Sequence, residues 1–305
     1  MVPFNVTVLG CGSATPTTRH YCSSQVVNYG GQLFMVDCAE GTQFQFRRNK
    51  FRDSRLNHVF ITHLHGDHCL GLIGLLSTFS LLGRTRDFHV FAPAEFGEIL
   101  RPQIDFFIPN ATFNVVFHPL TNNDCSVIFE DNQLTVRAFP LNHRVPCYGF
   151  LFTENNDSRH IIPECIRKYA IPNEAISGIK RGDDFLTADG RLIPNAELTT
   201  PPEPPRSFAY CSDTKFMEAP PEALQGVNLL YHESTYAESE APLAEMVYHS
   251  TSRQAALFAS KCHAQRLLIG HFSSRYDDES PLLAEAQAVF PETVLANENL
   301  VIEIG

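Results

Sequence analysis

The six residues His63-Leu64-His65-Gly66-Asp67-His68 decide the fold and the chemistry of this chain. They follow HVFIT, residues 58–62, a β-branched and aromatic run that is typical of a buried strand. They precede Leu70–Leu82, which we expect to be a helix. A loop between a strand and a helix can turn closely spaced side chains toward one point. Imidazole and carboxylate groups are ligands that Zn²⁺ accepts, and burying them together without a metal would be costly, so the sequence predicts a metal site here.

Further candidate ligands follow three other predicted strands. In α/β architectures, polar side chains after apolar strands gather at one edge of a sheet. The candidates are His143, Asp213 and His271. A short aspartate can bridge two metals, and more than four donors indicates more than one metal ion. We expect the isolated histidines to be surface or ordinary core residues, and these are His20, His58, His89, His118, His160 and His263.

The rest of the chain alternates predicted strands with predicted helices. We expect strands at Phe4–Gly10, Ser24–Tyr29, Gln32–Asp37, His58–Thr62, Val115–Phe117, Val127–Phe129, Leu134–Phe139, Ser207–Cys211, Val227–His232 and Arg266–Gly270. We expect helices at Thr42–Lys50, Leu70–Leu82, Ala94–Arg101 and Thr251–His263, the last capped by Ser250 or Thr251. From about Glu154 to Pro205 the chain is polar with scattered Pro and Gly, which indicates an inserted flexible arm that adds little to the main core.

Composition excludes several classes of protein. The chain has 305 residues, of which 44% are hydrophobic and 19% are charged, and this is globular composition with enough material for one large or two ordinary domains. No apolar run reaches the ~18 residues of a membrane span. MVPFNVTVLG, the first ten residues, has neither a basic nor an apolar signal region. Nine cysteines with no CxxC pair argue against a disulfide framework, so we expect a cytoplasmic protein.

Several motifs together resemble one enzyme family. HLHGDH at 63–68, with the later His, Asp and His, resembles the metallo-β-lactamase superfamily of zinc hydrolases. The match is closer to its tRNA 3′-processing branch, the ribonuclease Z family. The segments that carry this closer resemblance are VTVLGCGSATPTTRHYCSS at 6–24, NHRVPCYGF at 142–150, CSDTK at 211–215, HEST at 232–235 and HST at 249–251.

The resemblance implies a fold, a ligand set and a substrate. The implied fold is an αββα sandwich of two mixed β-sheets flanked by helices, a single domain over 1–305 with an inserted arm at about 154–205. One zinc ion would be held by His63, His65 and His143, and the other by Asp67, His68 and His271. Asp213 would bridge them, giving two Zn²⁺ per subunit, although Mn²⁺ or Fe²⁺ also suit these ligands. The implied partners are precursor tRNA and a second copy in a homodimer, with no membrane.

The resemblance also implies catalytic roles. Two metals clamp an in-line displacement at phosphorus and acidify a water. Asp67 would orient that water as general base. His249 would protonate the leaving oxygen, steered by Glu233. The products would be a tRNA with a 3′-OH and a trailer with a 5′-phosphate.

Two basic segments are candidates for RNA contact despite a net charge of −11. The first, residues 47–55, contains Arg47 and Arg48 with only one acidic residue. The second is Arg159–Arg181 in the arm, with five basic residues against two acidic ones. Its GIKRGDDF, at 178–185, resembles part of the family's arm, and this resemblance implies that Lys180 and Arg181 grip tRNA away from the cleavage site. After Arg275 the chain has seven acidic residues and no Lys or Arg, so much of the negative charge is confined to its end. RNA binding is therefore expected to be local and salt-sensitive.

Three alternatives stay open from the sequence. The chain could be another hydrolase of the same fold, such as a general phosphodiesterase. It could trim RNA as a 3′ exoribonuclease. It could be a non-catalytic RNA-binding module with structural zinc, although structural zinc sites are usually closed and often rich in cysteine, and no cysteine here has metal-ligand spacing.

Overall fold

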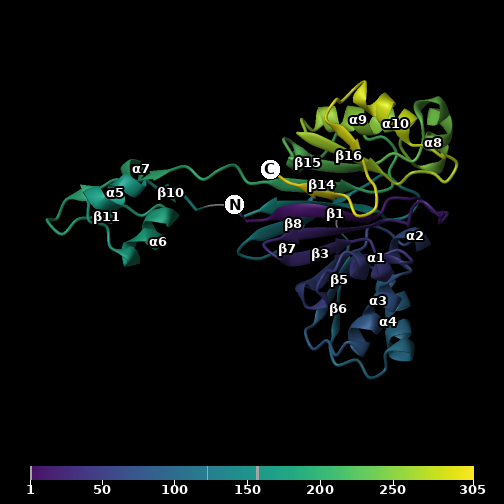
Figure 1. Ribbon diagram of the computed structural model, residues 1–305, viewed down its shortest axis with the longest axis horizontal. Helices are drawn as coiled ribbons and strands as arrows, with labels where there is room; N and C mark the ends of the chain where they lie inside the picture. Colours follow the sequence, from purple (N-terminus) through teal and green to yellow (C-terminus); the bar gives the residue numbers. More distant parts are fainter. Residues whose placement is uncertain (1, 122, 156–157) are drawn as a thin grey trace. The chain divides into compact units, whose positions relative to one another are not determined.

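The computed structural model describes residues 2–121, 123–155 and 158–305. The chain forms two compact units. The main unit comprises residues 1–130, 136–152 and 206–305, and the arm unit comprises residues 131–135 and 153–205. Figure 1 shows two sheets of the main unit lying face to face between two groups of helices.

The first sheet has seven strands and joins the two ends of the chain. Their order is β18 (Val301–Glu303), β1 (Phe4–Gly10), β2 (Ser24–Tyr29), β3 (Gln32–Val36), β4 (Leu56–Phe60), β5 (Phe88–Pro93) and β6 (Val115–Leu120). The strands from β18 to β3 pair antiparallel, and those from β3 to β6 pair parallel. The helices α1 (Thr42–Arg48), α3 (Leu72–Leu81) and α4 (Phe96–Phe107) share an apolar core with this sheet.

The second sheet also has seven strands. Their order is β17 (Thr293–Leu295), β16 (Arg266–Gly270), β15 (Leu229–Glu233), β14 (Ser207–Cys211), β9 (Tyr148–Glu154), β8 (Leu134–Pro140) and β7 (Ser126–Glu130). The four strands β14–β17 are parallel. Near this sheet lie α8 (Ala241–Val247), α9 (Ser252–Lys261) and α10 (Ser280–Gln287). Phenylalanines fill the space between the sheets, because Phe34 contacts Phe152 and Phe60 contacts Phe150.

Short elements complete the main unit. They are α2 (Gly66–Cys69), which carries the end of the histidine motif, and the 3₁₀ turns η1 (Asp53–Arg55), η2 (Glu222–Leu224) and η3 (Glu238–Glu240). No helix among the described residues is long and apolar enough to cross a membrane.

The arm unit has a small core of its own. Its elements are β10 (His160–Ile161), α5 (Pro163–Lys168), α6 (Asn173–Arg181), β11 (Phe185–Leu186), β12 (Leu192–Ile193), α7 (Asn195–Leu198) and β13 (Thr199–Thr200). Ile171, Ile179, Ile193 and Leu198 pack together in its interior. Asn195 donates its side-chain amide to the carbonyls of Ile179 and Asp183, which joins the end of α6 to α7.

Most predicted elements are present with shifted ends. The strands predicted at Phe4–Gly10, Ser24–Tyr29, Ser207–Cys211 and Arg266–Gly270 have those bounds. The helix predicted at Leu70–Leu82 is α3 (Leu72–Leu81), and Leu70 and Gly71 separate it from the short helix α2, which was not predicted. Gly71 lies against the carbonyl of Ala39, where a Cβ would overlap the oxygen atom. Thr251 caps α9 with a full capping box, because Thr251 and Gln254 bond each other's backbone N–H.

Candidate active site

The second sheet places three site residues at one edge. The parallel strands β14, β15 and β16 end at Cys211, Glu233 and Gly270, and Asp213 and His271 follow two of these ends. Cys211 pairs with His232, and Glu233 pairs with Gly270. Because neighbouring parallel strands end side by side, residues far apart in sequence meet here. The predicted strand-end placement is confirmed.

The first donor cluster consists of three histidines and one oxygen of Asp213. Nε2 of His63 lies 3.0 Å from Nδ1 of His65, and Nε2 of His143 lies 3.4 Å from the same Nδ1. Oδ2 of Asp213 lies 3.5 Å from Nε2 of His63. These four residues form a group that could hold a metal ion.

The second donor cluster surrounds the other oxygen of Asp213. Oδ1 of Asp213 lies 3.2 Å from Nε2 of His271 and 3.6 Å from Nε2 of His68. Oδ2 of Asp67 lies 3.4 and 3.5 Å from the same two nitrogens. All three of the atoms His68 Nε2, His271 Nε2 and Asp213 Oδ1 are buried without a hydrogen-bond partner. Buried polar atoms without partners are costly, and a cation would satisfy all three at once, so the residues present fit a metal pair that shares Asp213.

The outer ring nitrogens of four histidines are held by the protein. Nδ1 of His68 lies 2.8 Å from the buried carboxylate of Asp37, and Nδ1 of His271 lies 2.8 Å from Oγ1 of Thr235. Nδ1 of His63 faces Thr62 Oγ1, and Nδ1 of His143 faces the carbonyl of Tyr248. Such contacts fix the ring orientation and leave the inner nitrogens free to bind a metal.

Burial and charge set the protonation of these donors. Burial is the largest cause that lowers the pKa of His63, His65 and His143, which favours neutral imidazoles. Burial opposes the charged form of Asp67, but the nearby rings of His271 and His68 outweigh it and lower the pKa of this carboxyl. For Asp213, burial is likewise outweighed by the surrounding histidines, and its pKa is lowered.

His249 and Glu233 form a pair beside the two clusters. Nδ1 of His249 lies 2.9 Å from Oε1 of Glu233, and its Nε2 lies 4.0 Å from Oδ2 of Asp213. Burial would lower the pKa of His249, but Glu233 and Asp213 outweigh it and raise that pKa to about 9. The fully buried Glu233 accepts backbone N–H bonds from Thr214, Ser250 and Thr235, which compensate its charge.

Two open cavities meet at the donor clusters. One of about 370 Å³ is lined by Asp213, His249 and His271, and one of about 490 Å³ by Cys22, Glu40 and Leu70. His65, Asp67 and Arg144 line both cavities. A substrate thus has access to the donors from two sides.

The residues that support the donors were not predicted from the sequence. Asp37 was expected as the last residue of a strand, but it follows β3 with φ 56° and accepts from the backbone and hydroxyl of Thr62 as well as facing His68. The available signal for Asp37 in the sequence was an aspartate directly after an apolar run. Thr235, in HEST, had no assigned role, although its hydroxyl contacts Glu233 Oε2 at 2.7 Å.

The predicted basic residues lie in two places. Arg47 and Arg48 are the last two residues of α1 on the main unit; both are exposed, and Arg47 lines a cavity. Lys180 and Arg181 end α6 of the arm unit. Neither pair belongs to the donor clusters.

The chain matches one protein-family model and several curated proteins. Residues 4–158 match the family model described as anti-Pycsar protein Apyc1, so this half of the chain is of that domain family. The chain is 51% identical to a ribonuclease Z of Bacteroides fragilis over 304 residues and 46% identical to one of Porphyromonas gingivalis, with 100% of each protein covered.

Solved structures agree on the fold. Human tRNase Z, short form, is 26% identical with a TM-score of 0.73, and 99% of each chain is covered. The metallo-β-lactamase fold protein YhfI from Bacillus subtilis has a TM-score of 0.70 at 17% identity, with 99% of this chain and 100% of that chain covered. The expected αββα sandwich is confirmed. On this identity over its full length, the chain belongs to the ribonuclease Z family.

Proposed function

We propose that this protein is a zinc-dependent endoribonuclease that removes the 3′ trailer from precursor tRNA, leaving a 3′-OH on the tRNA and a 5′-phosphate on the trailer. The observation that carries the proposal is the position of Asp213, whose two oxygens face two different donor clusters with His249 beside them. A shared carboxylate between two imidazole clusters suits a pair of divalent ions. Family membership supports tRNA as the substrate.

The ligand assignment follows the two clusters. His63, His65 and His143 would hold one ion, Asp67, His68 and His271 the other, and Asp213 both. When bound, such a pair supplies Lewis-acid stabilisation of the phosphate and an acidified water. Nitrogen and carboxylate donors suit Zn²⁺ and also accept Mn²⁺ or Fe²⁺.

The chain's own residues would orient the water and protonate the leaving group. Asp67, held in its charged form by two histidines, would orient the attacking water. His249 would donate the proton on Nε2 to the O3′ atom that leaves phosphorus. Glu233 binds the opposite ring nitrogen of His249, so it fixes the ring and stabilises the charged imidazolium.

RNA contact, assembly and location are further parts of the proposal. Lys180 and Arg181 of the arm unit, with Arg47 and Arg48 of the main unit, would bind tRNA phosphates. The arm would serve as an inserted flexible module for that binding within an otherwise single metallo-β-lactamase-type domain. We expect a homodimer in the cytoplasm, as the family implies.

The decisive experiment is cleavage of a 3′-extended tRNA by the zinc-loaded protein, with both product ends mapped. One cut that yields a tRNA 3′-OH and an intact trailer with a 5′-phosphate supports the proposal. Single nucleotides released stepwise would show an exoribonuclease instead. Hydrolysis of small phosphodiesters without any cleavage of the tRNA would show a general phosphodiesterase, and metal binding without hydrolysis of either would show a non-catalytic module.

A further inference from the structure

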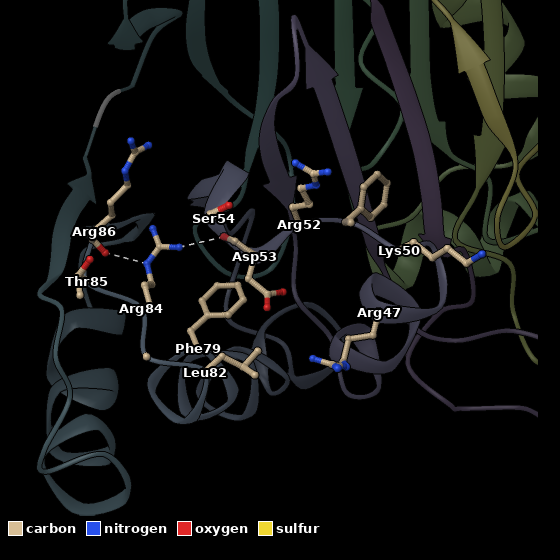
Figure 2. Close-up of a pocket in the computed structure, with 12 residues that line it drawn as sticks. Arg47, Lys50, Arg52, Asp53, Ser54, Phe79, Leu82, Arg84, Thr85 and Arg86 are labelled. Atoms are coloured by element: carbon tan, nitrogen blue, oxygen red, sulfur yellow. Dashed lines mark hydrogen bonds between the residues drawn. The ribbon is translucent and has the colours of Figure 1, made fainter.

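A cavity of about 660 Å³ on the main unit collects positive charge that the mechanism does not use. Five of its twelve lining residues are basic, namely Arg47, Lys50, Arg52, Arg84 and Arg86, and one is acidic, Asp53. The chain as a whole carries 23 basic residues against 34 acidic ones. Figure 2 shows these side chains together with the apolar Phe79 and Leu82, which also line the cavity. Such a concentration of cations on an acidic protein marks a local anion-binding surface.

Arg84 holds the backbone around this cavity in place. Its side chain is buried and donates to the carbonyls of Asp53, Leu56, Arg86 and Asp87 and to the side-chain oxygen of Asn57. These bonds join the turn before β4 to the turn before β5, and Figure 2 shows two of them. The guanidinium also lies over the rings of Phe79, Phe88 and Phe113. Arg84 therefore has no free donor for a ligand, but it rigidly places the turns that carry Arg52 and Arg86.

The other cations that line the cavity are exposed. A second cavity lies next to the first. Arg47, Lys50, Arg52 and Arg86 are exposed. A second cavity of about 270 Å³ shares Lys50, Phe51 and Arg52 with the first and adds Arg55. The two cavities are neighbours, and together we call them the basic groove. A basic surface that extends over two neighbouring cavities, with the aromatic side chain of Phe51 lining both, suits a polyanionic strand better than a compact anion.

We propose that the basic groove binds the phosphate backbone of the RNA substrate at a place remote from the cleavage site. The inference rests on the proposed function. Arg47, Lys50, Arg52, Arg55 and Arg86 contact phosphates, and Arg84 acts only as the residue that positions the two turns. Phosphate contacts of this kind add affinity without reading sequence.

The remoteness follows from the strand between the two sites. The basic groove borders the beginning of β4, since η1 directly precedes Leu56, whereas the donor loop His63–His68 follows the end of β4. Five residues of strand span about 17 Å. The groove therefore binds a part of the RNA well away from the scissile phosphate, and a small phosphodiester at the metal clusters cannot reach it.

The test compares two double variants with equal loss of charge. Arg52→Gln with Arg86→Gln removes two groove cations, and Arg101→Gln with Arg253→Gln removes two exposed arginines outside the groove. The zinc-loaded proteins are assayed on a 3′-extended tRNA and on bis(p-nitrophenyl) phosphate at several salt concentrations. The groove variant should raise KM for the tRNA several-fold with kcat unchanged, and should reduce the log–log salt dependence of kcat/KM by about 2, or about 1 per phosphate contact. Hydrolysis of the small ester should not change in either variant.

Each other outcome is informative. Equal effects of the two double variants on the tRNA would overturn the groove assignment, because only the total charge would then matter. Pyrophosphate that binds the wild type but not the groove variant, with tRNA kinetics unaffected, would show a small-anion site instead. If the wild type hydrolyses the small ester but leaves tRNA uncut, the proposed function fails first, and that result is distinct from a failure of the groove.

Discussion

Oε1 of Glu233 lies 2.9 Å from Nδ1 of His249. Oε2 of the same carboxylate accepts a hydrogen bond from the hydroxyl of Thr235, and this hydroxyl oxygen lies 2.8 Å from Nδ1 of His271. The buried carboxylate of Glu233 therefore holds the ring of His249 directly and the ring of His271 through Thr235. Each of its two oxygens serves one of these rings.

Replacing His249 by Ala should lower turnover of precursor tRNA by the ~10²–10⁴-fold typical of a lost general acid. Zinc content should stay at the wild-type value, because His249 belongs to neither proposed ligand set. Glu233→Gln should lower turnover as well, because the amide no longer stabilises the charged ring of His249. Turnover of His249→Ala equal to that of the wild type would rule out the role.

Replacing Asp37 by Asn should weaken metal binding rather than the proton transfer. Asp37 is fully buried and faces Nδ1 of His68 at 2.8 Å, and loss of such a partner typically lowers metal affinity by ~10–100-fold. Zinc retention against a chelator measures the effect. Excess zinc should restore activity to Asp37→Asn but not to His249→Ala. Unchanged zinc retention in Asp37→Asn would contradict the supporting role.

Two glycines near the donor loop should respond in opposite directions to alanine. A Cβ on Gly71 would overlap the carbonyl of Ala39, and this turn also carries the bond from Gly71 N–H to Cys38. Gly71→Ala should destabilise the protein by about 1–3 kcal/mol, as overpacking does. Gly74, inside α3, would meet only the end of Gln43 at 3.4 Å, so Gly74→Ala should be neutral or stabilise by up to about 1 kcal/mol. Urea unfolding of the two variants checks the contrast.

His58 should make the fold sensitive to acid. Burial, then the neighbouring His89, His118 and Arg84, lower the pKa of His58 to about 3, and its Nδ1 has no partner. The folded state keeps this ring neutral while the unfolded chain takes up a proton near pH 6.5. Stability is therefore complete above that pH and is lost as pH falls from 6.5 toward 3.

Replacing His58 by Phe should remove this pH dependence. The ring of His58 stacks between those of Phe34 and His89, so another aromatic ring fits the position. From pH 7 to pH 5 the free energy of unfolding of the wild type should fall by about 2 kcal/mol more than that of His58→Phe. Parallel pH profiles of the two proteins would show that His58 is not responsible.

Removing the two cations at the end of α6 tests the arm. Lys180→Gln with Arg181→Gln should raise KM for precursor tRNA and leave hydrolysis of a small phosphodiester unchanged, since these residues would touch only distant phosphates. Arg191→Gln, in the same unit but on a different turn, is the control. A loss of small-ester hydrolysis in the double variant would contradict an RNA-binding role.

The features that were predicted correctly from the sequence are those that a short local pattern of residues determines. The apolar runs before Asp213 and His271 predicted two strands with their observed bounds, HLHGDH indicated the fold, and segments such as HEST and HST indicated the family. The helices α5 and α6 were missed because their few buried residues, Cys165 and Ile179, pack only within the small arm core. The contacts of Asp37 and Thr235 depend on strand pairing across the sheets, which no local pattern encodes.

Backbone hydrogen bonds place the ends of β14, β15 and β16 side by side, and Asp213, Glu233 and His271 lie at or just beyond these ends. A substitution deep in this sheet that shifts one strand against its neighbour would therefore move one donor relative to the others, although it lies far from any substrate, and should lower turnover together with stability. Searches for inactivating changes in this enzyme should include the sheet interior as well as the residues around the cavities.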